Sequence, residues 1–283
     1  MIDPLRIRGK VFDWTHIPYY MGILNVTPDS FSDGGRFFRV EEAVERARYL
    51  LETGADILDI GGESTRPFSE PVPEEEELRR VVPVIKAIRK EFPDAVISVD
   101  TYKAKVAEEA VKAGADIVND ISACRFDPKM VEVLKDLQVP VIIMHMKGEP
   151  KTMQVNPEYQ DVVKEVKEFL KERLDFLVSQ GVDESKIIID PGIGFGKTFE
   201  HNLELISHLE EFKTLECPIL LGHSRKSFIG EIIGKEPSQR DGGTVGVSIF
   251  AYLKGVHILR VHEVSINKDA IETFKRLYHW TGV

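Results

Sequence analysis

Cysteine is scarce in this sequence, since Cys124 and Cys217 are the only two among 283 residues. The chain does not open on a charged segment followed by an apolar core, the pattern of a secretion signal. Long apolar runs are absent as well, and none approaches the ~18 residues that a membrane-spanning helix needs. Two thiols in such a chain are typical of a reducing compartment. We therefore expect a cytoplasmic protein with no disulfide and no membrane partner.

Positive charge is also in deficit. Lys and Arg number 37 against 47 Asp and Glu, which leaves a net charge of −10 at pH 7. A nucleic-acid-binding protein needs a basic field toward the phosphates, so we expect no nucleic-acid partner. Hydrophobic residues make up 42% of the chain, which is enough for a large core.

Short β-rich runs alternate with longer amphipathic stretches along the chain. The strand candidates are rich in Val, Ile and Leu, at 20–26, 57–60, 96–99, 117–119, 141–144, 187–190, 219–221 and 258–261. They show little polar alternation, as expected for strands buried on both faces of a parallel sheet. Helical patterns lie between them, at 40–52, 74–91, 103–112, 157–179 and 268–279. This order predicts the α/β class, with residues 1–283 as a single (β/α)8 TIM-barrel domain.

An internal echo supports the barrel prediction. Thr53-Gly-Ala-Asp-Ile-Leu-Asp-Ile recurs as Ala113-Gly-Ala-Asp-Ile-Val-Asn-Asp. Both segments run from a helix end through a short turn into a strand, as repeated β/α units do. The first 18 residues, with Phe12, Trp14 and Ile17 apolar, fit a hairpin or cap over the N-terminal mouth of the barrel.

Polar residues follow the predicted strands at every strand end, whereas the opposite ends carry Gly, Ala, Pro and short polar turns. Active sites of this fold are built from the loops after the strands, and the other rim serves stability. This asymmetry predicts an enzyme.

Three of these strand ends carry Asp100, Asn119 and Asp190. Carboxylate and amide groups that converge away from bulk water suit a ligand rich in N–H donors, such as a 2-amino-4-oxo pyrimidine edge. The alternatives are that they orient neighbouring loops or bind a metal.

Cationic residues follow the last two predicted strands. Arg260 and His262 stand two residues apart and so point to the same side of one strand, and Ser224-Arg-Lys-Ser227 follows the strand before it. The loops after strands 7 and 8 are the common phosphate site of this fold, often helped by a helix N-terminus. We therefore expect a diphosphate here. The alternative for Arg260 and His262 is an exposed salt-bridge pair.

Two polar loops are candidate lids over the barrel mouth, Asn25-Val-Thr-Pro-Asp-Ser-Phe-Ser-Asp-Gly-Gly35 and Gly61-Gly-Glu-Ser-Thr-Arg-Pro67. Such loops exclude water during a reaction when they close. Asn25 offers an amide oxygen to Mg²⁺, a hard ion that keeps most of its waters and bridges phosphates. The glycines after Asp190 are spaced Gly-x-Gly-x-Gly, which is not the dinucleotide pattern.

These motifs resemble those of the dihydropteroate synthase family. The resemblance covers roughly residues 20–263 and rests on eight pieces in the family's order: Met21-Gly-Ile-Leu-Asn-Val-Thr-Pro-Asp-Ser-Phe-Ser-Asp-Gly-Gly35, Asp59-Ile-Gly-Gly-Glu-Ser-Thr-Arg-Pro67, Ser98-Val-Asp-Thr, Asn119-Asp-Ile, Met144-His-Met, Asp190-Pro-Gly-Ile-Gly-Phe-Gly-Lys, Gly222-His-Ser-Arg-Lys-Ser and Arg260-Val-His-Glu. It implies that (7,8-dihydropterin-6-yl)methyl diphosphate and 4-aminobenzoate are joined with release of pyrophosphate.

The resemblance also implies roles for single residues. Catalytic roles fall to Asp33, Lys226, Arg260 and His262. The pterin diphosphate is held by Thr65, Asp100, Asn119, Asp190, Lys226, Arg260 and His262, and Asn25 contacts its Mg²⁺. The 4-aminobenzoate subsite is shaped by Phe31, Thr65, Arg66, Pro67 and Ser227, and His145 contributes near the buried ring. Family members are typically homodimers through outer barrel helices, so we expect a homodimer.

One position departs from the family pattern. The second loop usually continues Arg-Pro-Gly, whereas Phe68 follows Pro67 here. A bulky side chain lacks the backbone freedom of Gly, so the path of this loop near 4-aminobenzoate is where a difference is expected. Two rival functions remain open: a corrinoid-linked methyltetrahydrofolate methyltransferase, which has no use for a diphosphate clamp, and a non-catalytic pterin-binding protein.

Overall fold

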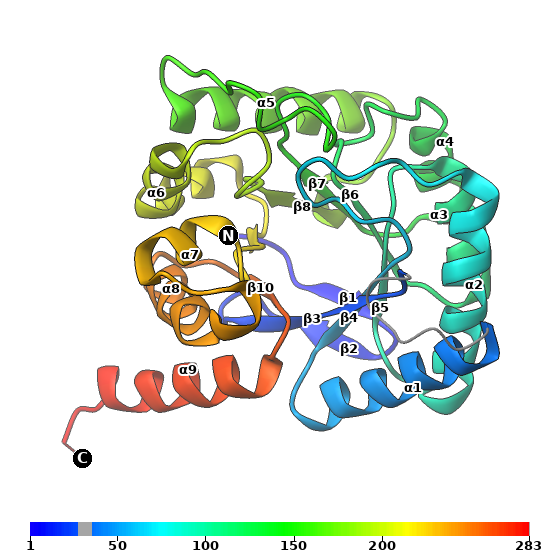
Figure 1. The fold of residues 1–283 in the computed structure, drawn as a ribbon, viewed down its shortest axis with the longest axis horizontal. Coiled ribbons are helices and arrows are strands. Elements are labelled where there is room, and N and C mark those ends of the chain that lie inside the picture. Colours follow the sequence, from blue (N-terminus) through cyan, green and yellow to red (C-terminus); the bar gives the residue numbers. More distant parts are fainter. Residues whose placement is uncertain (28–35, 283) are drawn as a thin grey trace.

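Eight parallel strands form one sheet in the part of the chain that the computed structural model describes, residues 1–27 and 36–282. Their order in the sheet is β8, β7, β6, β5, β4, β3, β10, β9. Ile189 and Ile219 form a parallel bridge that joins the two outer strands. The sheet therefore closes into a barrel, and Figure 1 shows the helices around it. The strands are β3 (Tyr19–Asn25), β4 (Ile57–Gly61), β5 (Ile97–Asp100), β6 (Ile117–Asp120), β7 (Val141–Met144), β8 (Ile187–Asp190), β9 (Leu220–Leu221) and β10 (Ile258–Val261).

The predicted (β/α)8 architecture is confirmed, and each predicted strand overlaps an observed one. The helix predicted at 157–179 begins later, at Val162, because the Asp161 side chain accepts a hydrogen bond from Lys164 N and caps it. The helix predicted at 268–279 begins earlier, at Val264. Its first turn was missed because Asn267, a polar residue, is buried there and interrupts the apolar pattern in the sequence. The described helices are α1 (Arg36–Glu52), α2 (Glu74–Glu91), α3 (Ala104–Ala113), α4 (Met130–Leu137), α5 (Val162–Ser179), α6 (Phe199–Ser207), α7 (Ser227–Ile233), α8 (Asp241–Leu253) and α9 (Val264–Tyr278).

Two apolar cores lie on the two faces of the barrel wall. The larger core fills the space between the strands and the helices. The smaller core lies inside the barrel near the starts of the strands and includes the N-terminal hairpin, β1 (Leu5–Ile7) and β2 (Lys10–Phe12). Phe12 and Trp14 of the hairpin segment are almost fully buried against it. The predicted cap over the N-terminal mouth is therefore confirmed.

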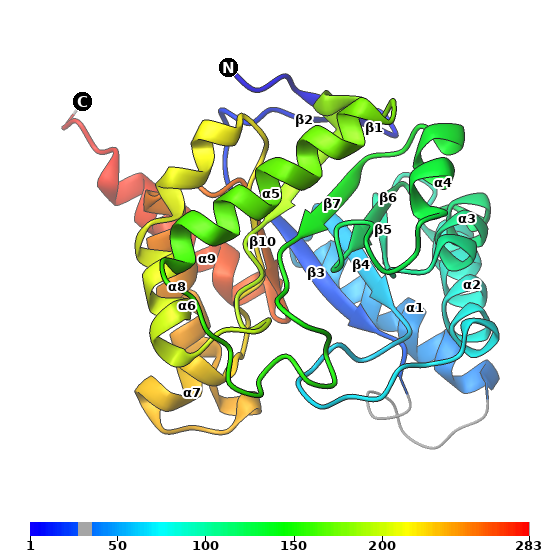
Figure 2. The ribbon, with the colours of Figure 1, turned by 90° about the horizontal axis from the view of Figure 1, so that it is seen from above.

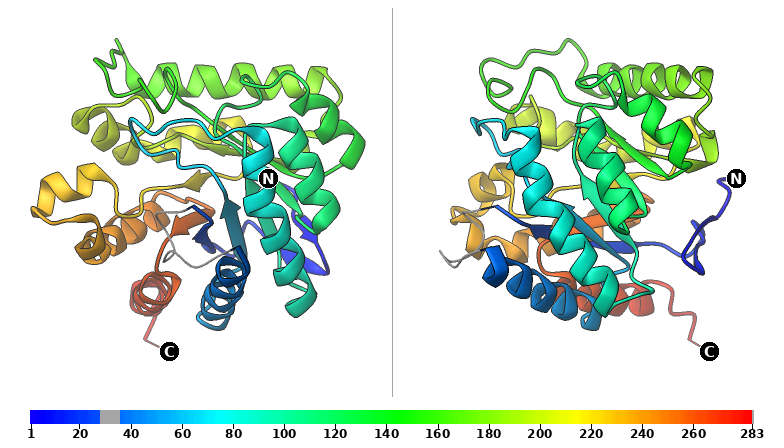
Figure 3. Two further views of the ribbon diagram at one scale, coloured as in Figure 1. Left: turned by 45° about the vertical axis from the view of Figure 1, so that its right-hand side comes forward. Right: turned by 90° about the vertical axis from the view of Figure 1, so that its right-hand side faces the viewer.

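The hairpin and the long loops occupy opposite ends of the barrel. Figure 2 shows β1 and β2 at one end and the loops that follow β4 and β7 at the other. The right panel of Figure 3 shows the same separation from another side. No helix among residues 1–27 and 36–282 is long and apolar enough to cross a bilayer.

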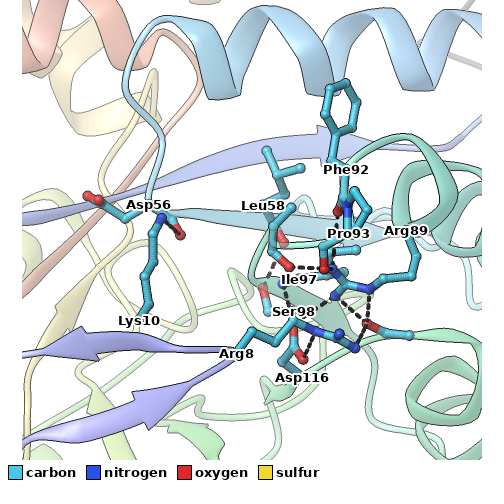
Figure 4. Close-up of polar contacts among 12 residues, drawn as sticks. Arg8, Lys10, Asp56, Leu58, Arg89, Phe92, Pro93, Ile97, Ser98 and Asp116 are labelled. Carbon is cyan, nitrogen blue, oxygen red and sulfur yellow. Dashed lines mark hydrogen bonds and ion pairs between the residues drawn. The ribbon is translucent and has the colours of Figure 1, made fainter.

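The two echoed segments are structurally equivalent. Asp56 accepts a hydrogen bond from Tyr20 N at 2.8 Å, and Asp116 accepts one from Ile97 N at 2.9 Å. Each aspartate therefore links the turn before one strand to the preceding strand: Asp56 links the turn before β4 to β3, and Asp116 links the turn before β6 to β5. Asp116 also pairs with Arg8 of the hairpin segment at 2.6 Å and with Arg89 of α2 at 2.9 Å (Figure 4). The hairpin is thus attached to the barrel by charge as well as by apolar packing.

Candidate active site

Polar side chains in the barrel interior lie directly above the smaller apolar core, which we call the plug. Successive strand residues point to opposite faces, so the residue two positions after a plug residue also points inward. In five strands that residue is polar. The pairs are Ile57 and Asp59 in β4, Val96 and Ser98 at β5, Ile117 and Asn119 in β6, Ile188 and Asp190 in β8, and Ile258 and Arg260 in β10. The strand period alone therefore gathers a polar layer at the C-terminal mouth.

Asp59 is the centre of this layer. It is fully buried, and its carboxylate accepts hydrogen bonds from Ser98 Oγ at 2.6 Å, Asn119 Nδ2 at 3.2 Å and Arg260 Nε at 2.7 Å. Asp59 therefore fixes Asn119 and Arg260 beside each other. Asp59 was not among the site residues predicted from the sequence. The internal echo, which aligns Asp59 with Asn119, is the signal that could have identified it.

Asp100 lies on the other side of Arg260, with 3.5 Å between Asp100 Oδ2 and Arg260 Nη2. Burial, and then the charge of Asp59, raise the pKa of Asp100 well above its ordinary value, while Arg260 opposes the shift. Burial alone would lower the pKa of Arg260, but Asp59 and Asp100 together raise it. The guanidinium therefore stays charged and is held between two carboxyl groups.

Asp190 and Lys226 form the second part of the layer. Asp190 Oδ1 accepts a hydrogen bond from Gly192 N at 2.8 Å. Lys226 Nζ donates to the carbonyl of Ile193 and lies 4.8 Å from the centre of the Phe195 ring. Burial lowers the pKa of Lys226 to about 8, with Asp190 opposing and Arg260 adding to the shift. Both side chains therefore depend on the glycine-rich turn after β8 for their placement.

Lys226 and Arg260 both approach Gly222. A Cβ placed on Gly222, directly after β9, would lie 3.9 Å from Lys226 Nζ and 4.0 Å from Arg260 Cδ. The charge of Asp190 in turn acts on both Lys226 and Arg260. The structure therefore brings Asp190, Lys226 and Arg260 to one mouth, close enough for one small substrate to touch all three.

His262 is bound by Ser224. Its Nδ1 is 2.7 Å from Ser224 Oγ, and its backbone N donates to the same oxygen at 3.1 Å. Burial, and then the charges of Arg225 and Arg260, lower the pKa of His262 to about 3. His262 is therefore neutral in the free protein at neutral pH, and its predicted role at the diphosphate stays a prediction. With Ser224 Oγ as the donor to Nδ1, the ring proton of a neutral His262 is on Nε2.

The second loop, residues 62–73, reaches the same region. Thr65 is half-buried, while Arg66 and Pro67 are exposed. The charge of Arg66 contributes to the lowered pKa of His262, so its guanidinium lies near enough to act on this imidazole. Ser227 begins α7 directly after Lys226 and is exposed.

Other predicted site residues are only partly covered by the structure. Asn25 ends β3, half-buried, and pairs in register with Gly61, which in turn pairs with Asp100. Phe31 and Asp33 lie outside the described residues. The roles assigned to all these side chains remain predictions, and the structure contributes the position of Asn25.

The loop after β7 supplies an apolar floor. Met144 and Met146 pack with Met153 and Phe195. His145 is buried, and its Nδ1 lies 2.9 Å from Lys197 Nζ. Among the described residues, no group of three or more His, Cys, Asp or Glu side chains is arranged to hold a metal ion. His145 therefore belongs to the packing of this floor.

Phe68 adopts a backbone conformation that favours glycine. Its φ is +66°, its side chain is 65% exposed, and its N donates to Pro150 O at 2.9 Å. The second loop therefore follows a glycine-like path although its sequence departs from the family pattern there. The hydrogen bond also ties this loop to the loop after β7.

We expect Phe68→Gly to raise the melting temperature by about 1–3 °C. The left-handed conformation costs a side-chain-bearing residue about 1–2 kcal/mol, which exceeds the roughly 0.5–1 kcal/mol that glycine loses in chain entropy. Phe68→Ala keeps the backbone cost and should not raise it. Glu216→Gly, at φ +57°, is the matched control and should show a similar gain. A lower melting temperature for Phe68→Gly would contradict the strain argument.

Comparison with known proteins gives the same picture. Residues 21–262 match the family described as pterin binding enzymes. A dihydropteroate synthase from Haemophilus influenzae is 47% identical over 271 residues, which cover 96% of this chain and 98% of that protein. The solved structure of Xanthomonas albilineans dihydropteroate synthase with 4-aminobenzoic acid has a TM-score of 0.92 and 44% identity, covering 99% of this chain and 100% of that one. The same enzyme in complex with 7,8-dihydropteroate has a TM-score of 0.88 and 43% identity, covering 98% and 100%.

The barrel, its polar mouth and the match over residues 21–262 define a pterin-binding enzyme of the (β/α)8 type. Within that class, identity of 47% over nearly the whole of both chains shows that the chain belongs to the dihydropteroate synthase family, the transferases of folate synthesis. The methyltransferase alternative is not favoured by any of these similarities.

Proposed function

We propose that this barrel condenses (7,8-dihydropterin-6-yl)methyl diphosphate with 4-aminobenzoate to give 7,8-dihydropteroate and pyrophosphate. The observation that carries the proposal is the meeting of acceptors and cations at one mouth. Asp190 and Asn119 suit the amino and N3–H groups of the pterin. Lys226 and Arg260, which flank Gly222, suit the negative charge of the diphosphate.

The reaction proceeds with departure of the diphosphate first. The C–O bond at the pterin methylene breaks, and its electron pair goes to the diphosphate, where Lys226, Arg260 and the Nε2–H of His262 stabilise the developing charge. The lone pair of the neutral arylamine then forms the C–N bond, and the amine proton passes to solvent. The aminobenzoate is held in line by Thr65, Arg66, Pro67 and Ser227 on one side and Phe31 on the other. No general base with a special pKa is needed.

Asp33 on the first loop offsets positive charge on the pterin in this scheme. The assignment rests on the family resemblance, because Asp33 lies outside the described residues. Asp33→Asn tests it: turnover equal to that of the unchanged protein at saturating substrates would remove Asp33 from the mechanism.

Mg²⁺ fits the residues near β3. Asn25 ends this strand next to Gly61, one register step from Asp100, and its amide offers a hard oxygen. Such an ion takes one or two protein oxygens and completes its shell with water and substrate phosphates. When bound, it would neutralise charge on the diphosphate. Measuring the KM for the pterin diphosphate with and without Mg²⁺, for the unchanged chain and for Asn25→Ala, tests this assignment.

A coupled assay tests the reaction as a whole. The chain is incubated with the pterin diphosphate and 4-aminobenzoate, with and without Mg²⁺, and pyrophosphate and dihydropteroate are measured. Equal amounts of both products are expected. A corrinoid-linked methyltransferase would release no pyrophosphate, and a non-catalytic pterin-binding protein would bind the pterin without turnover. Either outcome would overturn the proposal.

The pH profile provides a second test. The pKa of Lys226 is lowered to about 8 by burial, so its ammonium is present below that pH and is lost above it. We expect kcat/KM for the pterin diphosphate to fall about tenfold per pH unit above pH 8. Lys226→Arg, whose guanidinium keeps its proton, should be slower at neutral pH but should lack this alkaline decline. A decline that persists unchanged in Lys226→Arg would assign it to another group.

A homodimer is the expected assembly, through helices on the outside of the barrel. Support comes from apolar side chains that remain exposed on α7 and α8, among them Ile232, Phe250 and Leu253. Sedimentation of the chain at micromolar concentration tests this, and a monomer would contradict it. Both cysteines are buried free thiols, which supports a reducing, cytoplasmic setting. A thiol titration of protein taken from its native cells, finding oxidised cysteine, would count against it.

A further inference from the structure

Lys197 is a buried lysine that the proposed mechanism does not use. It closes the glycine-rich segment after β8, and only 1% of its surface is exposed. Its Nζ lies 2.9 Å from His145 Nδ1, 2.7 Å from Gly192 O and 2.9 Å from Phe195 O. An ammonium group has three N–H donors, so these neutral acceptors use all of them. Burial lowers the pKa of Lys197 well below its ordinary value, and the charge of Asp190 opposes this shift. A buried amine in contact with neutral acceptors is costly to keep charged, which calls for a reason to retain it.

The carbonyls that Lys197 binds belong to the turn that places Asp190 and Lys226. Gly192, whose O accepts from Lys197, donates its N to Asp190 Oδ1 at 2.8 Å. Phe195, whose O also accepts from Lys197, presents its ring to Lys226 Nζ at 4.8 Å. Lys197 thus binds the carbonyls at both ends of the turn, residues 192 and 195. A displacement of either carbonyl would move Asp190 or Lys226, the predicted pterin ligands.

The backbone of Lys197 is fixed from the other side by the loop after β7. Gln154 Oε1 accepts hydrogen bonds from Gly196 N at 2.9 Å and Lys197 N at 3.2 Å, and Gln154 Nε2 donates to Lys197 O at 2.9 Å. Tyr159 OH donates to Gly196 O at 2.7 Å. Lys197 is therefore the junction of two loops at the mouth. Its side chain binds the turn after β8 and His145 of the loop after β7, and its main chain is bound by Gln154 of that second loop.

We infer that Lys197 is a positioning residue for the pterin subsite: it clamps the turn after β8 so that Asp190 and Lys226 face the pterin. It touches no substrate itself. The second loop has an anchor of its own, since Lys103 Nζ binds Glu63 at 3.0 Å and also pairs with Glu77. One backbone hydrogen bond, from Phe68 N to Pro150 O, also joins this loop to the loop after β7. The two subsites therefore have different lysines behind them, and this difference makes the inference testable. The inference rests on the proposed reaction.

The test compares Lys197→Met with Lys103→Met, the same substitution at a buried lysine and at a partly buried lysine of one mouth. For Lys197→Met we expect the KM for the pterin diphosphate to rise tenfold or more while the KM for the arylamine substrate changes less than threefold. For Lys103→Met we expect the larger change in the KM for the arylamine substrate. A lysine that serves stability alone would lower the melting temperature and the active fraction and leave both KM values unchanged. That result for Lys197→Met, or equal rises in both KM values, would overturn the inference.

A second variant covers the case in which Lys197→Met does not fold. Gln154→Leu removes the outer half of the junction and leaves the buried ammonium in place, so we expect a smaller rise in the KM for the pterin diphosphate, about threefold. If Gln154→Leu leaves that KM unchanged or alters only the KM for the arylamine substrate, the clamp does not act on the pterin subsite. Failure of the proposed reaction itself is recognised separately, because the unchanged chain would then release no pyrophosphate.

Discussion

Asp59→Ala is expected to lower kcat/KM for the pterin diphosphate by about a hundredfold to a thousandfold. Asp59 is fully buried and holds Arg260 at 2.7 Å and Asn119 at 3.2 Å. Removing one partner of a buried ion pair leaves the other charge uncompensated, which costs about 3–5 kcal/mol. Here the affected group is Arg260, the proposed diphosphate ligand, which would keep only the longer contact to Asp100, at 3.5 Å. The loss should therefore appear in the reaction. Steady-state kinetics with pyrophosphate detection measures it.

The control for Asp59 is Ser98→Ala. Ser98 Oγ donates to the same carboxylate at 2.6 Å, but Ser98 carries no charge and is not predicted to bind substrate. We expect a loss below tenfold, in line with about 0.5–1.5 kcal/mol for one hydrogen bond. Melting temperatures of both variants report whether the barrel is intact. Activity of a folded Asp59→Ala within threefold of the unchanged protein would show that Arg260 needs no carboxylate to hold it.

Asp116→Ala should have the largest effect on stability. Its side chain is 9% exposed and pairs with Arg8 at 2.6 Å and Arg89 at 2.9 Å (Figure 4). Burial lowers the pKa of Arg89, and Asp116 is the main group that opposes this. Without this carboxylate, the guanidinium groups of Arg8 and Arg89 lose a charged partner and Ile97 N loses its hydrogen-bond acceptor. We therefore expect the free energy of unfolding to fall by about 3–5 kcal/mol. Urea unfolding followed by circular dichroism measures the change.

Asp56→Ala is the matched control at the equivalent position of the echo. Asp56 accepts one backbone hydrogen bond, from Tyr20 N at 2.8 Å, and Lys10 donates only to its carbonyl, at 3.4 Å. We expect a loss of about 1–2 kcal/mol. Both changes lie at the N-terminal end of the barrel, so both KM values of the folded enzyme should stay within twofold. A comparable loss in the two variants, or a changed KM, would show that the ion pairs of Asp116 are not what stabilises this end.

The strands, the barrel and the functional rim followed from local sequence because their causes are local. Strands such as Ile187–Asp190 are short apolar runs, and the polar residue that ends each run must lie at the C-terminal mouth of a parallel barrel. Asp190 and Arg260, far apart in the chain, could therefore be placed at one mouth before any coordinates. The N-terminal cap followed from its apolar residues in the same way.

The rest of the site depends on distances that no local pattern encodes. The central position of Asp59 arises because β4 lies between β3 and β5 and because Arg260 reaches across from β10. The neutral state of His262 depends on its burial among several arginines. The positive φ of Phe68 follows from a hydrogen bond to Pro150 in another loop. Each of these features comes from neighbours that are distant in sequence.

The closure of the barrel has a consequence for its dynamics. β9 has only two residues, and a single bridge between Ile189 and Ile219 joins it to β8. This junction is the weakest line in the wall, and the amides of β9 should exchange with solvent before those of β4 or β5. Asp190 lies at the end of β8, and Lys226 follows β9 on the other side of this junction. A pterin bound to both residues would link the two strands. Substrate binding should therefore slow amide hydrogen exchange at this junction.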